Sequence, residues 1–306
     1  MAKLKINEHF NPNSDLVLYN GDCLELLKEI PNETVKLVVT SPPYNIGKEY
    51  EKKLSINDYL ESQKKVIDES IRITKSTGSI CWQVGNYVDN GEIIPLDILL
   101  YPIFTSYKLK LRNRIVWHFG HGLHASKRFS GRYEVILWFT KNDDYTFNLD
   151  SVRIPQKYPQ KKYFKGPKAG QFSCNPIGKN PGDIWDIPNV KSNHIEKTQH
   201  PAQFPVELIE RLVLSLTNED DWTFDPFMGV GTTQIASIIH KRKSIGSETV
   251  KDYYETALER IKLAESGKLL VRPMERPVFN PDSKEYIPPK VVKLNSEPSL
   301  FRNQED

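Results

Sequence analysis

The segment at residues 35–40, VKLVVT, restricts the possible folds of this chain more than any other. An aliphatic and β-branched run without polar alternation is typical of a strand that is buried on both faces, as in the parallel sheet of an α/β protein. The run stops at SPPY, residues 41–44, because proline has no N–H group to donate to a central sheet ladder. The sequence therefore predicts a buried parallel strand with a stiff loop at its carboxyl end.

Segments with strand and helix patterns alternate along the chain. The strand-like segments are residues 17–20, 35–40, 79–84, 113–118, 133–140, 222–225 and 243–248. The helix-like segments are residues 23–29, 55–74, 93–107, 205–216, 232–240 and 253–265. This alternation predicts an α/β fold with a mainly parallel sheet and helices on both faces. The first fifteen residues are expected to be an irregular lead-in, and the chain from about residue 274 a loosely packed polar tail.

The composition argues against several classes of protein. With 38% hydrophobic and 26% charged residues in a chain of 306, a folded globular protein is expected. No apolar run approaches the roughly 18 residues that span a bilayer, and the N-terminus lacks the apolar core of a secretory signal, so we expect a cytoplasmic protein with no membrane partner. The cysteines at 23, 81 and 174 have neither disulfide nor metal-ligand spacing, and the histidines at 118–124 lack a nearby acid, so no metal site is expected.

Positive charge is concentrated in one stretch, although the net charge of the chain is only +3. Residues 151–182 contain no acidic residue, and their cations alternate with aromatic side chains. Lysine can neutralise phosphates, and aromatic rings can stack on bases. The stretch alone is explained equally well as a solvated loop.

A glycine-rich turn follows the strand expected at 222–225. Residues 225–233 read DPFMGVGTT and lead into a helix. Glycine lets the backbone approach a ligand closely, and ligands of open α/β sheets bind at the carboxyl edge of the strands. There Asp225 could hold an ammonium or hydroxyl group, and Glu248 could receive ribose hydroxyls. No Gly-Lys-Ser/Thr follows, which argues against a nucleoside triphosphatase.

The loop at residues 41–44 is suited to holding an amino group. Pro42 and Pro43 fix two φ angles, so the loop carbonyls have little freedom. Such a carbonyl and the Ser41 hydroxyl can accept the hydrogens of an amino group, while the Tyr44 ring can stack on a planar base. For the two prolines alone, a plain strand terminator is the simpler interpretation.

Together the two motifs resemble those of a known enzyme family. TSPPYN and DPFMGVGTT are similar to the catalytic and cofactor motifs of the amino-directed (N4-cytosine/N6-adenine) DNA methyltransferases, and their order resembles the beta group of that family. Three further matches fall in the same order: Gly21-Asp22, HPAQFP at 200–205 and RYEVILW at 132–138. The resemblance covers roughly residues 19–260, which is most of the chain.

The resemblance implies a Rossmann-like methyltransferase fold and S-adenosyl-L-methionine as the cofactor. It assigns catalysis to Ser41, Pro42, Pro43 and Tyr44. It assigns cofactor binding to Asp22, Asp225, Pro226, Phe227, Gly229, Gly231, Thr232 and Glu248. The basic stretch corresponds to the target-recognition region, which implies DNA contacts by Lys157, Lys161, Lys162 and Lys165. The implied organisation is a catalytic half at 1–150, a target-recognition insert at 151–193, a cofactor half at 194–270 and a polar tail at 271–306.

Ser41 bears on the identity of the methylated base. Adenine-directed members of the family usually carry Asp or Asn at this position and cytosine-N4 members usually carry Ser, so the resemblance favours cytosine N4, with adenine N6 as the alternative. None of the three cysteines follows a proline, as the nucleophile of the C5-methylating enzymes does, which argues against that chemistry.

The partners implied are double-stranded DNA with a flipped target base and a companion restriction endonuclease acting on the same site, with the protein a monomer or homodimer. An RNA or small-molecule methyltransferase and a non-catalytic DNA-binding module are the alternatives from other classes.

Overall fold

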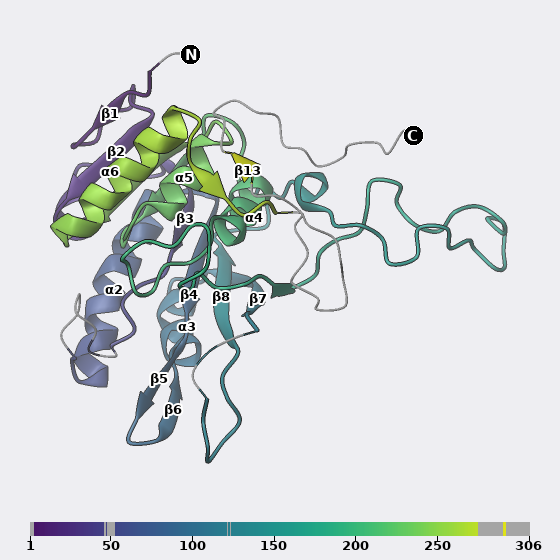
Figure 1. Cartoon of the computed structure of the whole chain (residues 1–306), viewed down its shortest axis with the longest axis horizontal. Coiled ribbons are helices and arrows are strands. Elements are labelled where there is room, and N and C mark those ends of the chain that lie inside the picture. The colour runs from purple at the N-terminus through teal and green to yellow at the C-terminus, as the bar shows by residue number, and fades with distance from the viewer. Residues whose placement is uncertain are drawn as a thin grey trace.

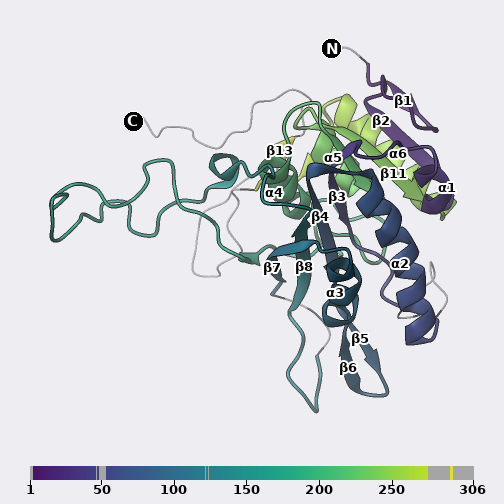
Figure 2. The ribbon, with the colours of Figure 1, turned by 180° about the vertical axis from the view of Figure 1, so that it is seen from behind.

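An open, twisted sheet with helices on both faces forms the body of the molecule (Figures 1 and 2). The computed structural model describes residues 3–45, 47, 53–120, 122, 124–274 and 290–291. In this described part the sheet has nine strands, in the order β1-β2-β11-β10-β3-β4-β8-β7-β9. The predicted α/β class with a mainly parallel sheet is confirmed.

Strand direction determines which ends meet at the edge of the sheet. The strands are β1 (Ile6–Asn7), β2 (Leu16–Asn20), β3 (Val35–Thr40), β4 (Thr74–Val84), β7 (Lys110–His118), β8 (Tyr133–Thr140), β9 (Ile184–Asp186), β10 (Trp222–Asp225) and β11 (Lys243–Glu248). Neighbouring strands are parallel except at β8, which is antiparallel to both β4 and β7. The carboxyl ends of β2, β3, β4, β10 and β11 therefore share one edge of the sheet with the beginning of β8.

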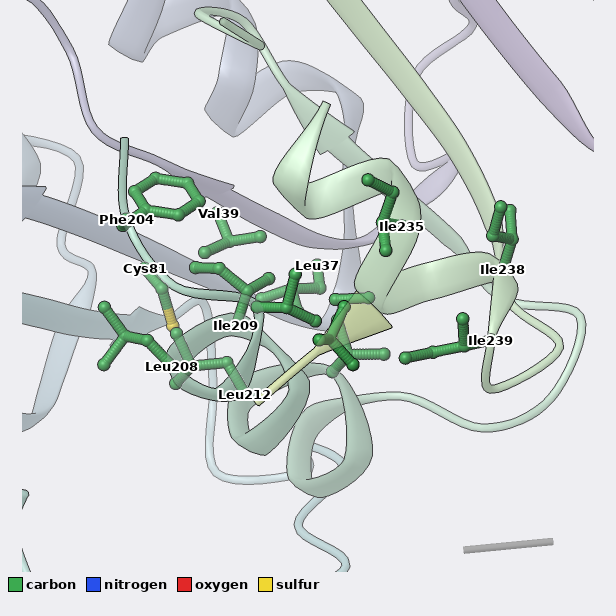
Figure 3. Close-up of a cluster of buried hydrophobic side chains, with 14 of the residues drawn as sticks. Leu37, Val39, Cys81, Phe204, Leu208, Ile209, Leu212, Ile235, Ile238 and Ile239 are labelled. Atoms are coloured by element: carbon green, nitrogen blue, oxygen red, sulfur yellow. The ribbon is translucent and has the colours of Figure 1, made fainter. Parts of the chain in front are cut away.

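Three helices cover each face of the sheet. The helices α1 (Cys23–Leu27), α2 (Ile56–Ile73) and α3 (Leu96–Ser106) pack on one face, and α4 (Val206–Leu216), α5 (Thr232–Ile238) and α6 (Lys251–Glu265) pack on the other. Alternate residues of each strand enter the two cores: Leu37 and Val39 lie in the core with α4 and α5 (Figure 3), and Val38 lies in the core with α2 on the other face. In the described part of the chain, no helix is both long enough and apolar enough to cross a membrane.

A hairpin replaces the first residues of a predicted helix. The sequence predicted a helix at 93–107, but β5 (Asn86–Asp89) pairs with β6 (Glu92–Pro95), and α3 begins only at Leu96. Asn90 and Gly91 have φ angles of 47° and 87°, the left-handed conformation that a tight two-residue hairpin turn requires. The Asn-Gly pair was the available sequence signal for this turn.

The two ends of the described chain are more ordered than the sequence suggested. Within the expected irregular lead-in, β1 adds a parallel edge strand to β2. At the start of the predicted tail, Arg272 is buried and pairs with Glu207, and β12 (Leu270–Val271) pairs with β13 (Lys290–Val291). The rest of the predicted tail, 275–289 and 292–306, lies outside the described residues.

The basic stretch projects away from the body as a long excursion (Figures 1 and 2). It begins after the 3-10 turn η1 (Leu149–Val152) and is held to itself by two isolated antiparallel bridges, Ile154 with Lys179 and Lys162 with Phe172. It returns to the sheet at β9, which pairs in parallel with β7. The last part of the predicted 151–193 insert therefore belongs to the body of the molecule.

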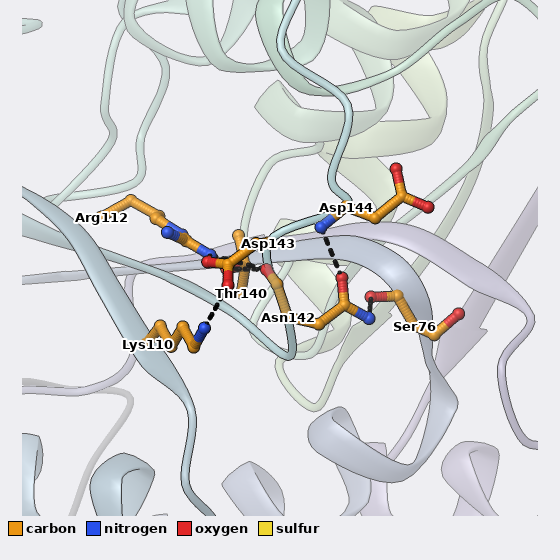
Figure 4. Close-up of polar contacts among 7 residues, drawn as sticks. All are labelled: Ser76, Lys110, Arg112, Thr140, Asn142, Asp143 and Asp144. Atoms are coloured by element: carbon orange, nitrogen blue, oxygen red, sulfur yellow. Dashed lines mark hydrogen bonds and ion pairs between the residues drawn. The ribbon is translucent and has the colours of Figure 1, made fainter.

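Polar contacts fix the end of β8 that lies opposite the carboxyl edge. Asp143 accepts a hydrogen bond from Arg112 Nη2 at 2.7 Å and is also paired with Lys110 (Figure 4). Beside it, Asn142 Nδ2 donates to the backbone oxygen of Ser76 at 2.9 Å. This exposed cluster holds neighbouring strands together at the edge of the sheet that lies away from the functional motifs.

Candidate active site

One cavity of about 270 Å³ opens at the carboxyl edge of the sheet and brings both sequence motifs together. The motif loops after β3 and β10 contribute Ser41, Pro42, Pro43, Tyr44, Pro226, Phe227, Met228, Gly229, Val230 and Thr232 to its wall. The ends of β2 and β11, the 200–204 segment and α6 complete the wall with Gly21, Asp22, Cys23, Ser247, Glu248, Thr249, His200, Ala202, Gln203, Phe204 and Tyr253. Segments that lie nearly 200 positions apart in the chain thus share one cavity.

Asp225 joins the two motifs from behind the cavity wall. Its carboxylate accepts hydrogen bonds from the Thr40 and Thr233 hydroxyls, each at 2.6 Å, and from the Phe227 backbone N–H at 3.1 Å. The side chain is 0% exposed, and this burial raises its pKa to about 6 against the opposing effect of the three hydrogen bonds. Asp225 is therefore placed to hold the loops in position. The expectation that it would itself hold an ammonium or hydroxyl group of a ligand does not match this placement.

The two glycines of the turn have different surroundings. Gly229 lines the cavity with φ 53°, and a Cβ atom there would lie 3.3 Å from Nε2 of His200. Gly231, with φ 77°, precedes α5 and does not line the cavity, and a Cβ atom there would lie 3.0 Å from the Cβ of Ala257 in α6. Gly229 keeps the cavity open, whereas Gly231 lets α5 pack closely on α6.

A buried arginine supports the turn from the other side. Arg260 Nη1 donates to the backbone oxygen of Val230 at 2.6 Å and to the Thr232 hydroxyl at 3.2 Å. Burial lowers the pKa of Arg260 to about 10, so the guanidinium stays protonated at neutral pH. The glycine turn is thereby fixed at the start of α5.

Carboxylates supply the charge at the wall of the cavity. Glu248 accepts hydrogen bonds from the backbone N–H groups of Gly229 at 2.9 Å and Val250 at 2.8 Å, and burial raises its pKa. Asp22 lies at the start of α1 and accepts from the N–H of Leu24 at 2.8 Å. Each carboxylate oxygen has a second lone pair that a ligand hydroxyl or amine can use.

Positive charge is absent from the described lining of this cavity. None of the lining residues is Lys or Arg, and burial followed by the charge of Lys197 lowers the pKa of His200 to about 4, which keeps that ring neutral. The ring of His200 packs edge-on against Tyr253 at a centroid distance of 4.5 Å. A cavity with two carboxylates and no cation suits a positively charged ligand and is poorly suited to a polyphosphate.

The Ser41–Tyr44 loop is fixed by a network that reaches β4 and β8. The Tyr44 hydroxyl lies 3.0 Å from Ser41 Oγ, accepts a hydrogen bond from Gln83 Nε2 at 2.7 Å and donates to Glu134 Oε2 at 3.2 Å. Gln83 also donates to Glu134. Burial raises the pKa of Glu134 to about 7 and holds that of Tyr44 well above its ordinary value.

Most of the residues that the resemblance assigned to catalysis or cofactor binding lie together at this cavity. Of the twelve residues assigned to catalysis or cofactor binding, the structure places all in the cavity wall except Asp225 and Gly231, which lie behind it. His200, Gln83 and Glu134 received no role from the sequence. His200 and Glu134 stand within segments that were already noted as motifs, whereas Gln83 lies in an apolar strand with no distinguishing signal.

The other predicted site residues lie apart from the cavity. Lys157, Lys161, Lys162 and Lys165 are exposed on the projecting insert. Among the described residues, no group of three His, Cys, Asp or Glu side chains is placed to hold a metal ion. His118 bonds to Asp186 at 2.5 Å, and His121 lies outside the described residues.

Comparison with known proteins shows which family has a similar sequence. The sequence model of the family N6_N4_Mtase, described as DNA methylase, matches residues 35–259. The Type II methyltransferase M.BglII of Bacillus subtilis is 50% identical over 243 residues, covering 79% of this chain and 68% of that protein. The Type II methyltransferase M.ScaI of Streptomyces caespitosus is 40% identical over 269 residues, covering 85% and 86%.

Solved structures show the same architecture. The PvuII DNA methyltransferase (cytosine-N4-specific) superposes with a TM-score of 0.65 at 22% identity over 80% of this chain and 86% of that chain, a likeness that concerns the fold alone. A putative DNA modification methylase from Thermus thermophilus, in complex with S-adenosyl-L-methionine, gives a TM-score of 0.56 at 28% identity over 79% and 91%.

The cavity fits the cofactor of that complex. S-Adenosyl-L-methionine carries a sulfonium and an ammonium group, and the described wall offers the carboxylates of Asp22 and Glu248, no Lys or Arg, and an opening at Gly229 that a Cβ atom would narrow. The family match over most of the chain and the shared fold agree with the resemblance found in the motifs. The chain therefore belongs to the N6/N4 DNA methylase family and uses S-adenosyl-L-methionine as its methyl donor.

Proposed function

We propose that this protein methylates the exocyclic amino group of one base within a specific sequence of duplex DNA, and that the base is cytosine, methylated at N4. The observation that carries the proposal is the shared cavity, in which the Ser41–Tyr44 loop and the glycine turn are joined through the 2.6 Å bond between Thr40 and Asp225. A loop that can hold an amino group and a cavity suited to a cationic methyl donor are thus adjacent.

The residues that hold the cofactor are proposed from the cavity wall. Glu248 and Asp22 would accept hydrogen bonds from its hydroxyl and amino groups, Gly229 would allow close approach of the backbone, and Phe227 would cover an apolar surface. When bound, the cofactor supplies a methyl group on a sulfonium centre that an amine can displace directly.

The catalytic loop is proposed to orient the amino group. Ser41 Oγ and the backbone carbonyl of Pro42 would accept its hydrogens, which directs the nitrogen lone pair toward the methyl group. The Tyr44 ring would stack against the flipped base. Positioning and fixed dipoles, with no covalent intermediate, would supply most of the acceleration.

Cytosine N4 is favoured over adenine N6 by the residue at the start of the loop. Ser41 occupies the position at which adenine-directed relatives usually carry Asp or Asn, and this residue lines the cavity. A curated relative named for adenine, the DNA adenine methyltransferase YhdJ of Escherichia coli (strain K12), is 33% identical over 261 residues, so adenine N6 is the second candidate.

The projecting insert is proposed to hold the DNA. Its four lysines are exposed, and three of them lie over neighbouring rings: Lys157 over Tyr158, Lys162 over Phe172 and Lys165 over Phe164. Exposed lysines bind phosphates, and exposed rings can stack on bases. The segment 124–132, with Lys127 and Arg128 exposed and Phe129 99% exposed, offers a second cationic and aromatic contact beside the carboxyl edge.

We also propose a companion endonuclease that cleaves the same sequence when it is unmethylated. The support is that several relatives are named Type II methyltransferases. The protein is predicted to act as a monomer or a homodimer, and sedimentation of the purified protein would distinguish the two.

The test is identification of the modified nucleoside. Unmethylated duplex DNA is incubated with the protein and S-adenosyl-L-methionine labelled in its methyl group, then digested to nucleosides and separated. Label in N4-methylcytosine is expected, at one sequence context. Label in N6-methyladenine would show that adenine, and not cytosine, is the target base. Label in an RNA duplex but not in DNA, or in neither nucleic acid, would overturn the proposed function.

A further inference from the structure

The hydrogen-bond network behind the catalytic loop ends on a carboxyl group that sequence reasoning did not single out. Glu134 is the second residue of the antiparallel strand β8, so it reaches the same edge of the sheet as the loop after β3. It does not line the cavity and is connected to it through the Tyr44 hydroxyl. Its route to the cavity therefore runs through Tyr44.

From this arrangement, and resting on the proposed function, we infer that Glu134 is a positioning residue that receives the proton of the methylated amino group through Tyr44 and Ser41. The three oxygen atoms form a continuous chain, with 3.0 Å between Ser41 and Tyr44 and 3.2 Å from Tyr44 to Glu134. The second distance is long for a hydroxyl–carboxylate bond, and such bonds tighten when substrate binds.

Gln83 sets the direction in which hydrogen bonds are donated along this series of three oxygen atoms. Its Nε2 donates to both the Tyr44 oxygen and Glu134, so the Tyr44 oxygen serves as an acceptor and its own hydrogen points to Glu134. Ser41 can then donate to Tyr44, which leaves the lone pairs of Ser41 free to accept a hydrogen of the amino group. Gly85 permits this packing, because a Cβ atom there would lie 3.0 Å from the Tyr44 ring and 3.3 Å from Glu134 Oε1.

The atoms balance without any further reactant. The carbon–sulfur bond breaks with its electron pair remaining on sulfur, and the amino lone pair forms the new carbon–nitrogen bond, which leaves a positive charge on nitrogen. One N–H bond then releases its electrons to nitrogen as its proton passes to Ser41 Oγ. The Ser41 proton passes to Tyr44, and the Tyr44 proton passes to Glu134 Oε2. All three side chains end neutral.

The surroundings of Glu134 and Tyr44 favour the protonation states that the proton relay needs. Tyr44 is the titratable side chain that contacts Glu134. On the adjoining strands its neighbours are Gln83 and the register partner Trp117, which are uncharged. Burial raises the pKa of Glu134 to about 7, so the carboxylate is present above that pH and can accept a proton. The raised pKa of Tyr44 keeps its hydroxyl protonated, as a relay requires.

The experiment compares Glu134→Gln with the wild type in single-turnover methylation from pH 6 to pH 8.5, with affinities for S-adenosyl-L-methionine and DNA measured alongside. At pH 8 we expect a rate about 10- to 100-fold lower in the variant, since acid–base catalysis commonly contributes factors of this order or larger. The difference should shrink toward pH 6, where the wild-type carboxyl is itself protonated. Both affinities should stay within about threefold.

Two further variants separate the relay from a structural role. Tyr44→Phe keeps the ring and removes the relay hydroxyl, so it should show a similar loss, and the double variant should lose little more than either single variant. Asp143→Asn removes an exposed carboxylate at the opposite end of β8 and should leave the rate unchanged (Figure 4). A readout independent of turnover is the infrared difference between the wild type and Glu134→Gln, in which the band of a protonated carboxyl group should titrate near pH 7, because other buried carboxyl groups with raised pKa values, such as Asp225 and Glu207, are common to both proteins.

The outcomes distinguish the two levels of the account. A Glu134→Gln enzyme as fast as the wild type at pH 8, or one slowed equally at every pH with weakened cofactor binding, would overturn the relay and leave the function intact. A wild-type protein that labels no DNA would overturn the function itself. If Glu134→Gln fails to fold, the Tyr44→Phe rate and its pH profile decide.

Discussion

The cavity wall and the projecting insert contrast in how the chain holds them. The two motif loops at the cavity are tied to a 0% exposed carboxylate by three hydrogen bonds and backed by helices on both faces of the sheet. In the insert, every residue from 157 to 172 is exposed, and two isolated bridges connect its outgoing and returning segments. Methyl transfer needs fixed geometry, whereas grip on a DNA backbone needs charge and reach.

This contrast has a consequence for mutation. Changes in the wall should act on the cofactor, on the chemistry and on the stability of the fold, and should depend little on salt. Changes in the insert should act on DNA affinity, should depend strongly on salt, and should leave cofactor binding unchanged.

The largest effect is expected for Asp225→Ala. The change leaves the Thr40 and Thr233 hydroxyls and the Phe227 N–H without their buried acceptor. We expect loss of methylation and of measurable cofactor binding, with the free energy of unfolding lowered by about 3 kcal/mol or more. Urea unfolding and titration calorimetry measure these quantities. A variant that binds the cofactor like the wild type would contradict the role of Asp225 in holding the two motif loops in position.

The next effect concerns the insert, in a variant with Lys157, Lys161, Lys162 and Lys165 all changed to alanine. We expect DNA affinity at moderate salt to fall on the order of 100-fold and the slope of log K against log salt to drop by about 3 to 4, since each phosphate contact contributes about 0.9. Cofactor affinity should be unchanged. An unaltered salt slope would show that these lysines do not contact phosphate.

A matched pair of glycines gives a smaller effect that compares the regions directly. Gly229 and Gly170 both have positive φ, but a Cβ atom at 229 meets His200 at 3.3 Å, whereas nothing lies within 4 Å at 170. Both alanine variants carry the backbone cost of about 1 kcal/mol. We expect Gly229→Ala to weaken cofactor binding about tenfold, and Gly170→Ala to leave it unaltered. Equal effects on the cofactor would contradict the division of roles.

The smallest effect is expected from thiol labelling. Cys23 and Cys81 are buried, and burial raises the pKa of both thiols, whereas Cys174 is half-buried in the insert. A maleimide should therefore modify Cys174 first without changing cofactor affinity, and bound DNA should slow that reaction several-fold. Mass spectrometry of the labelled peptides would reveal a different order of reaction if the insert packed against the body.

The division also explains which parts could be predicted from the sequence. The strand pattern at 35–40 and the two motifs fixed the sheet and the cavity edge, because each is a local signal with a direct physical cause. The roles of Asp225 and Gly231 could not be predicted in the same way. Only the packed structure shows that one is enclosed by Thr40 and Thr233, and that the other faces Ala257.

Residues joined through space were missed for the same reason. Gln83 and Glu134 lie 51 positions apart and meet at the catalytic loop because β4 and β8 are antiparallel neighbours. The insert returns to the sheet at β9 because β9 pairs with β7. A strand of three residues carries too weak a sequence pattern for this pairing to be predicted. The hairpin at Asn90-Gly91 is different, because its signal is local and was available.

The central claim is that amino methylation takes place where the Ser41–Tyr44 loop meets the glycine turn. The most direct test is a single turnover of Tyr44→Ala in a preformed complex with labelled S-adenosyl-L-methionine and DNA, beside the wild type. We expect the wild type to label a base amino group, and the variant to bind the cofactor with unchanged affinity but transfer methyl at least about 100-fold more slowly, which corresponds to a barrier higher by about 2.7 kcal/mol. Transfer by Tyr44→Ala at the wild-type rate would place the chemistry elsewhere in the molecule.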